Sequence, residues 1–117
     1  MGPTVTDDEP ADQLFAHERF RWGEAMRDAR GIRVVDLDLW DPKSPPDLRD
    51  LGTAGVLIGQ LDETGFLSDI VKQDGEWIVA VELDGDLRGF AANTLGEAAA
   101  WALLAVWDAS EPDLESA

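Results

Sequence analysis

Residues 66–91 read FLSDIVKQDGEWIVAVELDGDLRGFA, and this stretch decides the fold. It contains two Asp-Gly pairs, and such a pair readily adopts the positive φ angles of a two-residue hairpin turn. Between the pairs, apolar side chains alternate along the chain as they do in a strand with one buried face. We therefore predict a three-stranded antiparallel meander over Phe66–Gln73, Trp77–Leu83 and Leu87–Ala91.

A helix is predicted directly after the meander, over residues 95–108. Thr94 and Glu97 have the spacing of a capping box, which satisfies unpaired N–H groups at a helix start. The central run of this helix is apolar on every side, whereas a helix on the sheet of a monomer should keep one polar face. We expect a homodimer with Trp101 and Trp107 as anchors, and an earlier helix of the same chain is the alternative cover.

Three further elements are predicted before the meander. Apolar spacing favours a helix over Leu14–Arg30, and alternation favours a strand over Ile32–Trp40. Three prolines in residues 42–46 indicate a connector, and the spacing over Asp47–Thr64 favours another helix. The predicted fold class is α+β, an antiparallel sheet of about four strands packed with three helices in the order α-β-α-β-β-β-α.

The length and the character of the ends predict one domain. A chain of 117 residues can form one hydrophobic core, and residues 13–108 are expected to form it. The ends, residues 1–12 and 109–117, are acidic and contain proline, so we expect them to be disordered.

Strong acidity dominates the composition. The chain has 9 Lys and Arg against 25 Asp and Glu, a net charge of −16, and about −8 belongs to the body between the acidic ends. A field of this sign repels nucleic acid and anionic membranes and accelerates encounter with basic proteins. We expect a basic protein partner and no direct contact with nucleic acid or membrane. The alternative is that acidity only maintains solubility.

Three features that the sequence does not have bear on the cellular compartment of the protein. There is no cysteine, the first residues are acidic where an export signal would be basic and then apolar, and the longest apolar run is too short to cross a bilayer. We expect a cytoplasmic protein, in the host cell if phage-encoded.

The search for chemistry favours no enzyme and no cofactor. His17 has neither a cysteine nor a tyrosine to work with and is expected on the surface. Asp36, Asp38 and Asp41 suggest a hard cation, but aspartates alternating with apolar residues usually mark the solvent face of a strand. Lys72 lacks the paired carboxylates of an acid-acid-lysine nuclease. We therefore expect neither catalysis nor metal binding.

Two sets of residues are candidates for a binding site. The interface set combines acids and tryptophans: Asp36, Asp38, Trp40, Trp101 and Trp107. The second set is a possible anion or ligand site, formed by a basic cluster and a glycine stripe on the second helix: Arg27, Arg30, Arg33, Gly52, Gly55 and Gly59. Charge pairing of the arginines and close backbone approach at the glycines are the favoured explanations of this second set.

The order of elements resembles the phage α/β/α-sandwich (ABA sandwich) domain family of small phage proteins. The matching segments are Gly31–Trp40, Asp50–Ala54, Gly75–Val79 and Ala92–Ala98, within about residues 31–108. The closing Thr-x-x-Glu-Ala helix is also similar to HicB-type antitoxins, which the glycine-rich second helix does not fit. The phage resemblance implies provenance, because small acidic phage proteins often act against a host system, and it assigns no catalytic or binding residue.

Together these observations predict a small acidic, non-enzymatic binding protein. We expect a phage-type accessory or anti-host-defence inhibitor that docks on a basic host nuclease or DNA-binding protein, as a DNA mimic. Two alternatives stay open. One is an oligomer that sequesters a small nucleotide signal, and the other is an immunity protein against a basic toxin.

Overall fold

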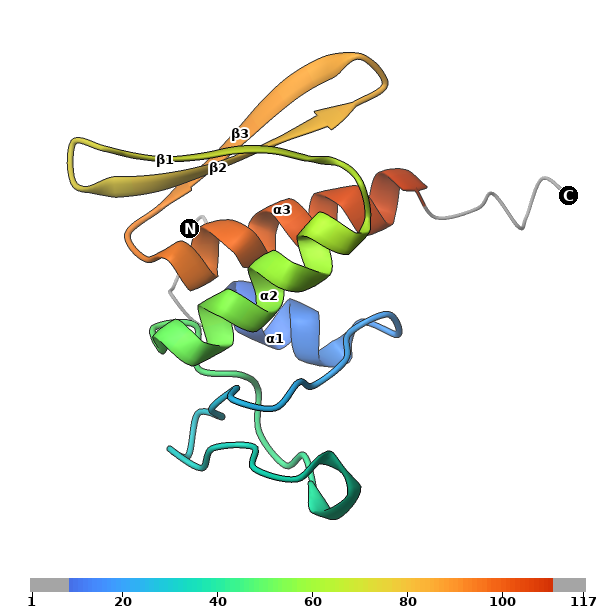
Figure 1. The fold of residues 1–117 in the computed structure, drawn as a ribbon, viewed down its shortest axis with the longest axis vertical. Coiled ribbons are helices and arrows are strands. Elements are labelled where there is room, and N and C mark those ends of the chain that lie inside the picture. The colour runs from blue at the N-terminus through green and yellow to red at the C-terminus, as the bar shows by residue number, and fades with distance from the viewer. Residues whose placement is uncertain (1–8, 111–117) are drawn as a thin grey trace, which may run out of the picture.

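The two Asp-Gly pairs form tight turns, and the three strands around them build the sheet. A computed structural model describes residues 9–110, in which β1 (Leu67–Gln73), β2 (Glu76–Leu83) and β3 (Asp86–Ala92) pair antiparallel in that order (Figure 1). At the first turn φ is 53° and 81°, and at the second it is 53° and 83°. Because both positions of each turn have positive φ, the hairpins match the twist of the strands. The predicted meander is confirmed.

The register of the strands gives the sheet one apolar and one open face. In β2 the side chains of Val79, Val81 and Leu83 are buried. Side chains alternate between faces along a strand, so Ile78, Ala80 and Glu82 lie on the opposite side. In β1 the register shifts between Leu67 and Asp69, which leaves one extra residue as a bulge at the edge of the sheet.

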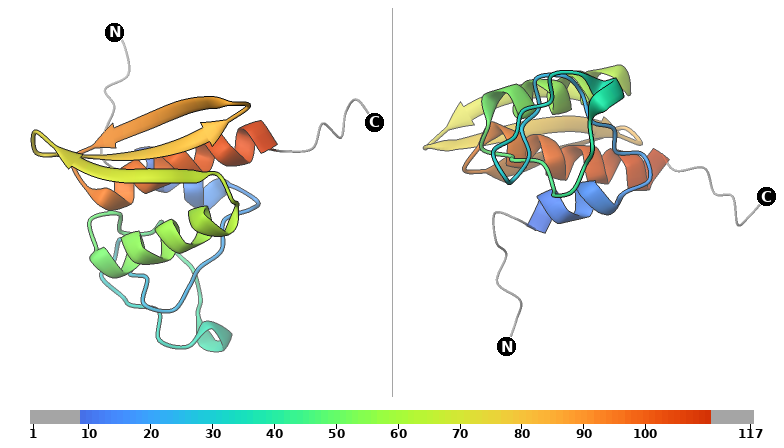
Figure 2. Two further views of the ribbon diagram at one scale, coloured as in Figure 1. Left: turned by 45° about the horizontal axis from the view of Figure 1, so that its top comes forward. Right: turned by 90° about the horizontal axis from the view of Figure 1, so that it is seen from below.

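The last helix, α3 (Leu95–Ser110), lies against the apolar face of the sheet (Figures 1 and 2). At its start the Glu97 backbone N–H donates to the Thr94 hydroxyl over 3.2 Å, and that hydroxyl donates to the Glu97 carboxylate over 2.8 Å. On the side away from the sheet, α3 packs against α1 (Glu9–Ala16) and α2 (Leu51–Glu63). Elements of the same chain therefore cover both sides of the apolar helix.

The hydrophobic core is centred on α3 and receives side chains from every other element. It includes residues with less than a tenth of their surface exposed, such as Leu14 of α1, Leu57 and Leu61 of α2, Val79 and Val81 of β2, and Leu103 and Trp107 of α3. Burial of aliphatic side chains of this size contributes roughly 1.5–3 kcal/mol each to folding. The core thus holds three layers together, with the sheet on one side and α1 and α2 on the other.

The helix predicted over residues 14–30 is wrong, because helical structure ends at Ala16 and residues 17–50 are largely irregular. Two local features interrupt it. The carboxylate of Asp28 accepts hydrogen bonds from the backbone N–H groups of Arg30 and Ile32, in competition with helical bonding. Ala25 adopts a φ of 83°, which is incompatible with a right-handed helix.

The strand predicted over residues 32–40 is also wrong. The Asp36 carboxylate accepts a hydrogen bond from the Asp38 N–H and starts a short 3-10 helix, Leu37–Leu39. Val35 is 80% and Leu39 is 82% exposed, so their alternation does not mark a buried face. The sheet accordingly has three strands and not four, and the order of elements is α-α-β-β-β-α.

The boundary predicted at residue 12 falls inside α1, where Pro10 and Ala11 are buried. The other parts of the predicted disordered ends, residues 1–8 and 111–117, lie outside the described residues. Across residues 9–110, no helix is both long and apolar enough to cross a bilayer.

Candidate functional site

The face of the sheet opposite α3 is an exposed apolar surface built from regular structure. We call it the outer sheet face and define it by Val71, Ile78, Ala80, Leu87, Gly89 and Ala91, which the register places on one side. Val71 is 41% and Leu87 is 67% exposed. No described helix packs on this side, because α1, α2 and α3 all lie beneath the sheet (Figure 1). The outer sheet face is therefore available for binding.

Small residues make the middle of the outer sheet face shallow. At Gly89, an added Cβ would come within 3.2 Å of the Ile78 Cγ2, so the glycine leaves room over the Ile78 side chain. Alanines occupy the neighbouring positions of β2 and β3, at Ala80 and Ala91. A partner can therefore approach the backbone of these two strands closely.

Carboxylates surround this apolar centre. The strands and turns of the sheet carry six exposed acids: Asp69, Asp74, Glu76, Glu82, Asp84 and Asp86. Within residues 9–110 none of the six takes part in an ion pair. The two bases of the sheet, Lys72 and Arg88, pair in register with Trp77 and Val81 and so lie on the α3 side, as does Asp86 opposite Leu83. Asp69, Glu76 and Glu82 lie on the outer side. The outer sheet face is negative along its rim.

The negative charge is concentrated in one half of the sequence. Residues 17–50 contain seven Lys and Arg against eight Asp and Glu, whereas residues 51–108 contain two against ten. The first segment is thus almost neutral, with a net charge of −1, and the second carries −8. Acids of the sheet supply most of this excess, so the field is strongest where the apolar face is exposed.

The predicted basic cluster is neutralised by neighbouring carboxylates. Arg30 binds Asp28 over 2.7 Å, and Arg27 lies 3.8 Å from Asp47. Burial alone would raise the pKa of the fully buried Asp28, but hydrogen bonds from Ile32 and Arg30, together with the Arg30 charge, lower the pKa of this carboxyl overall. These arginines hold the irregular segment together.

Arg33 makes the most extensive of these contacts. Its guanidinium donates to both carboxylate oxygens of Asp50, over 2.8 and 3.0 Å, and to the Ala25 carbonyl over 2.7 Å. The Arg33 hydrogen bond, with the N–H and hydroxyl of Thr53, lowers the pKa of Asp50 to about 2, although partial burial opposes this. The same pair raises the pKa of Arg33. Asp50 is also the N-cap of α2, so this ion pair fixes the irregular segment to the helix.

The glycine stripe of α2 divides into two kinds of position. At Gly52 an added Cβ would collide with the Ala25 carbonyl and lie 2.8 Å from a guanidinium nitrogen of Arg33. At Gly55 and Gly59 an added Cβ would meet nothing within 4 Å. Close backbone approach therefore explains Gly52 alone, and the three glycines do not line one pocket.

The tryptophans of the predicted interface set lie in different environments. Trp107 is buried, and its ring centroid lies 4.7 Å from that of His17, which explains why this histidine is half-buried and not fully on the surface. Trp101 is half-buried against the core. Trp40 packs against Trp22 in the irregular segment, with the two ring centroids 5.0 Å apart. Because α1 and α2 cover α3, the apolar helix no longer requires a second copy of the chain.

Asp36 and Asp38 of the interface set are exposed. Asp36 is the N-cap of the 3-10 helix, and Asp38 is its central residue. Asp36 accepts one local backbone hydrogen bond, and Asp38 shares the exposed loop with Val35 and Leu39. Their position is compatible with contact to a partner, but they lie on a segment distinct from the outer sheet face.

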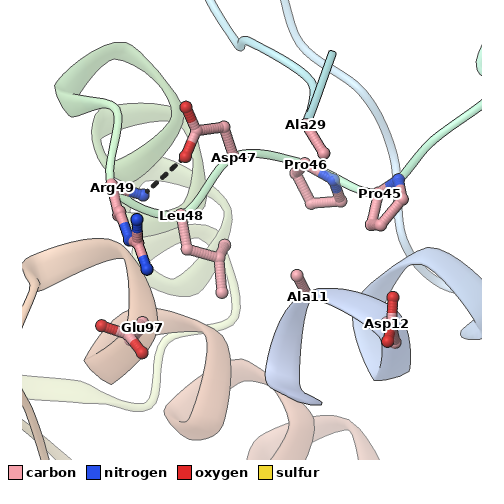
Figure 3. Close-up of a pocket in the computed structure, with 9 residues that line it drawn as sticks. All are labelled: Ala11, Asp12, Ala29, Pro45, Pro46, Asp47, Leu48, Arg49 and Glu97. Atoms are coloured by element: carbon pink, nitrogen blue, oxygen red, sulfur yellow. Dashed lines mark hydrogen bonds between the residues drawn. The ribbon is translucent and has the colours of Figure 1, made fainter. Parts of the chain in front are cut away.

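A pocket of about 470 Å³ lies between the start of α1, the loop before α2 and the first turn of α3 (Figure 3). Its polar lining residues are Asp12, Asp47, Arg49 and Glu97 (Figure 3). A second pocket, of about 400 Å³, lies beside α2 and includes Gly59. Neither of these pockets is lined by Arg27, Arg30 or Arg33, so the basic cluster does not converge on a ligand cavity there.

In the part of the chain that the structure describes, no three His, Asp or Glu side chains are grouped so that they could hold a metal ion. No protein-family model matches the chain, and neither the curated proteins nor the solved structures give a match. Function is therefore inferred from the residues themselves.

Proposed function

We propose that this chain is a non-enzymatic binding protein that docks on a basic protein partner. The observation that carries the proposal is the coincidence of exposed apolar surface and unpaired carboxylates on one side of the sheet. In residues 17–50, by contrast, Asp28, Asp47 and Asp50 each neutralise an arginine. The acids of the sheet have no such internal use within residues 9–110.

The proposed mechanism has two parts. The negative field accelerates the encounter with a positive surface, and this contribution weakens as salt screens it over a Debye length of about 10 Å at 0.1 M. After the encounter, the exposed side chains of Val71 and Leu87 lose their contact with water and slow dissociation. Affinity should therefore depend on salt mainly through the association rate.

The finer proposal is that the partner is a basic nuclease or DNA-binding protein, and that the chain is a phage-type inhibitor acting as a DNA mimic. Its support is the sign and density of the charge together with the resemblance to small phage proteins. Of the four segments that carry this resemblance, the first, Gly31–Trp40, is not a strand, whereas Gly75–Val79 lies in the central strand and its turn. An immunity protein for a basic toxin would use the same mechanism.

We do not extend the proposal to a nucleotide ligand. Each arginine of the basic cluster lies beside a carboxylate, so the charge that a phosphate would need is already offset. A thermal-shift screen with nucleotides checks this point, because a bound nucleotide would raise the melting temperature.

Capture of proteins from a bacterial lysate on the immobilised chain tests the proposed function. We expect basic nucleases or DNA-binding proteins to be retained at low salt and released as salt rises. The matched control is a variant in which Asp69, Glu76 and Glu82 are replaced by the corresponding amides, which removes charge and keeps shape. Capture that does not change with salt, or that is equal for this variant, would contradict the electrostatic mechanism.

A further inference from the structure

The outer sheet face has the dimensions of a single helix. Three strands about 4.8 Å apart, each seven or eight residues long, present a surface roughly 10–14 Å wide and about 23 Å long. A helix with its side chains is about 10–12 Å in diameter, and about 15 residues of helix span 23 Å. One helix of the partner would therefore cover the face, and two would not fit side by side.

The shape of the face favours a helix. Small residues, Ala80, Gly89 and Ala91, lie beside one another on β2 and β3, and one larger apolar side chain lies on each strand, at Val71, Ile78 and Leu87. An apolar helical stripe can approach the sheet over the small residues and contact the larger ones. Addition of a strand to a sheet edge would instead leave the apolar face exposed to water.

The negative charge of the rim determines which kind of surface can bind there. A second copy of this chain on the same face would bring carboxylates such as Asp69, Glu76 and Glu82 against their equivalents, which is unfavourable at low dielectric. Lysine or arginine flanking an apolar stripe would meet these acids with opposite charge. Charge complementarity thus identifies a basic amphipathic helix as the occupant.

We propose that the outer sheet face binds an amphipathic helix of the basic partner, with its apolar stripe on Ile78, Ala80 and Gly89 and its basic flanks against the rim acids. This inference rests on the proposed function and adds the site and the kind of element that is recognised. The buried surface would be well below that of a standard interface, so binding through this face alone should be weak and transient.

The probe for the test is a synthetic helical peptide of about 15 residues with a leucine and alanine stripe flanked by lysines. Titration into the labelled full chain, followed by backbone amide NMR at low salt, should shift the amides of Ile78, Ala80, Gly89 and their neighbours. A peptide with glutamate in place of lysine is the control and should give no shift. Shifts confined to residues 35–39 or to α2, or no shift with the lysine peptide, would overturn the inference.

Matched variants separate a defined site from net charge. Glu82→Lys on the rim and Asp62→Lys on α2 change the charge equally, and Asp62 is exposed and outside the sheet. We expect Glu82→Lys to weaken binding of the lysine peptide about 10-fold and Asp62→Lys less than about 2-fold. Equal losses would mean that the chain attracts the peptide only through its overall charge.

A second pair tests the apolar contact without changing charge. Val71→Thr with Leu87→Thr keeps good strand formers and should weaken binding about 5- to 10-fold, whereas Leu51→Thr, at a 79% exposed position of α2, should leave binding unchanged. If the sheet variants bind as tightly as wild type while lysate capture still depends on salt, the docking face is wrong and the proposed function stands. If capture does not depend on salt, the proposed function itself fails.

Discussion

Residues 17–50 and residues 51–110 use their charged side chains in opposite ways. In the first segment regular structure is almost absent, and ion pairs such as Arg30–Asp28 and Arg33–Asp50 add to scattered backbone hydrogen bonds and isolated β-bridges. In the second, helices and strands satisfy the backbone, and the acids of the sheet stay exposed and unpaired within the described residues. The comparison teaches that the same residue type holds the fold in one region and is available for binding in the other.

The largest expected effect comes from Asp28, which is fully buried, accepts three hydrogen bonds from the Arg30 and Ile32 backbone N–H groups and the Arg30 Nε, and forms an ion pair with Arg30. Asp28→Ala would remove the acceptor of these part-buried bonds and leave a cavity at a buried position, and should lower the free energy of unfolding by about 3 kcal/mol. Denaturant unfolding followed by tryptophan fluorescence measures the change. Asp36→Ala is the matched control, because Asp36 also binds a backbone N–H two residues on but is exposed, and it should have little effect.

If the Asp28→Ala variant were about as stable as the Asp36→Ala variant, the contrast drawn between the two regions would not hold. Such a result would show that the ion pairs of residues 17–50 are not what holds this segment on the rest of the chain.

A smaller effect is expected where the two regions touch, at Gly52. Gly52→Ala would place a methyl group against the Ala25 carbonyl and should destabilise the protein by about 2 kcal/mol. Gly55→Ala, one turn further along the exposed side of α2, meets open space and should stabilise it by up to about 1 kcal/mol through helix propensity. Thermal unfolding of the two variants therefore should shift in opposite directions. Shifts of the same sign would mean that α2 and residue 25 do not approach as closely as described.

Sequence was sufficient for the second region because its signals are local. The Asp-Gly turns at 74–75 and 84–85, the Thr94–Glu97 cap and the helix after Asp50 each depend on residues a few positions apart. The apolar character of α3 was also predicted, but which element covers it depends on packing between distant segments. Spacing alone favoured a second copy of the chain, with an earlier helix as the alternative.

The first region could not be predicted because contacts between distant residues, together with local side-chain hydrogen bonds, decide its structure. The Arg33–Asp50 contact joins residues 17 apart, and the hydrogen bond from the Arg27 N–H to the Thr53 hydroxyl joins residues 26 apart. Phe15 and Trp22 have helical spacing, but their rings meet edge to face without a continuous helix between them.

The sequence and the structure lead to docking surfaces of the same chemical character at different positions in the chain. Sequence indicated an acidic docking surface, but the residues proposed for it were Asp36, Asp38 and three tryptophans, not the sheet acids. The missing signal was the alternation of Ile78 and Ala80 with the buried residues of β2, which marks a second apolar face. That face is exposed because α3 covers the sheet on one side only.

The smallest expected effect concerns the pH dependence that distinguishes the two regions. The pKa of Asp50 is lowered to about 2 from 3.8, so its ion pair with Arg33 stabilises the fold fully above the unfolded value of 3.8 and is lost as pH falls through about 2. Because Arg33 is exposed to solvent, screening should keep this contribution smaller than the effects of the Asp28 and Gly52 variants.

Unfolding by denaturant at pH values between about 5 and 2 should show this loss in the wild type, and Asp50→Asn should flatten that part of the profile. Glu82→Gln is the matched control from the sheet. Glu82 has no ion-pair partner among the described residues, so its amide variant should keep the wild-type slope. If both variants changed the slope alike, the carboxylates of the two regions would contribute to the fold in the same way, and the division between structural and docking acids would fail.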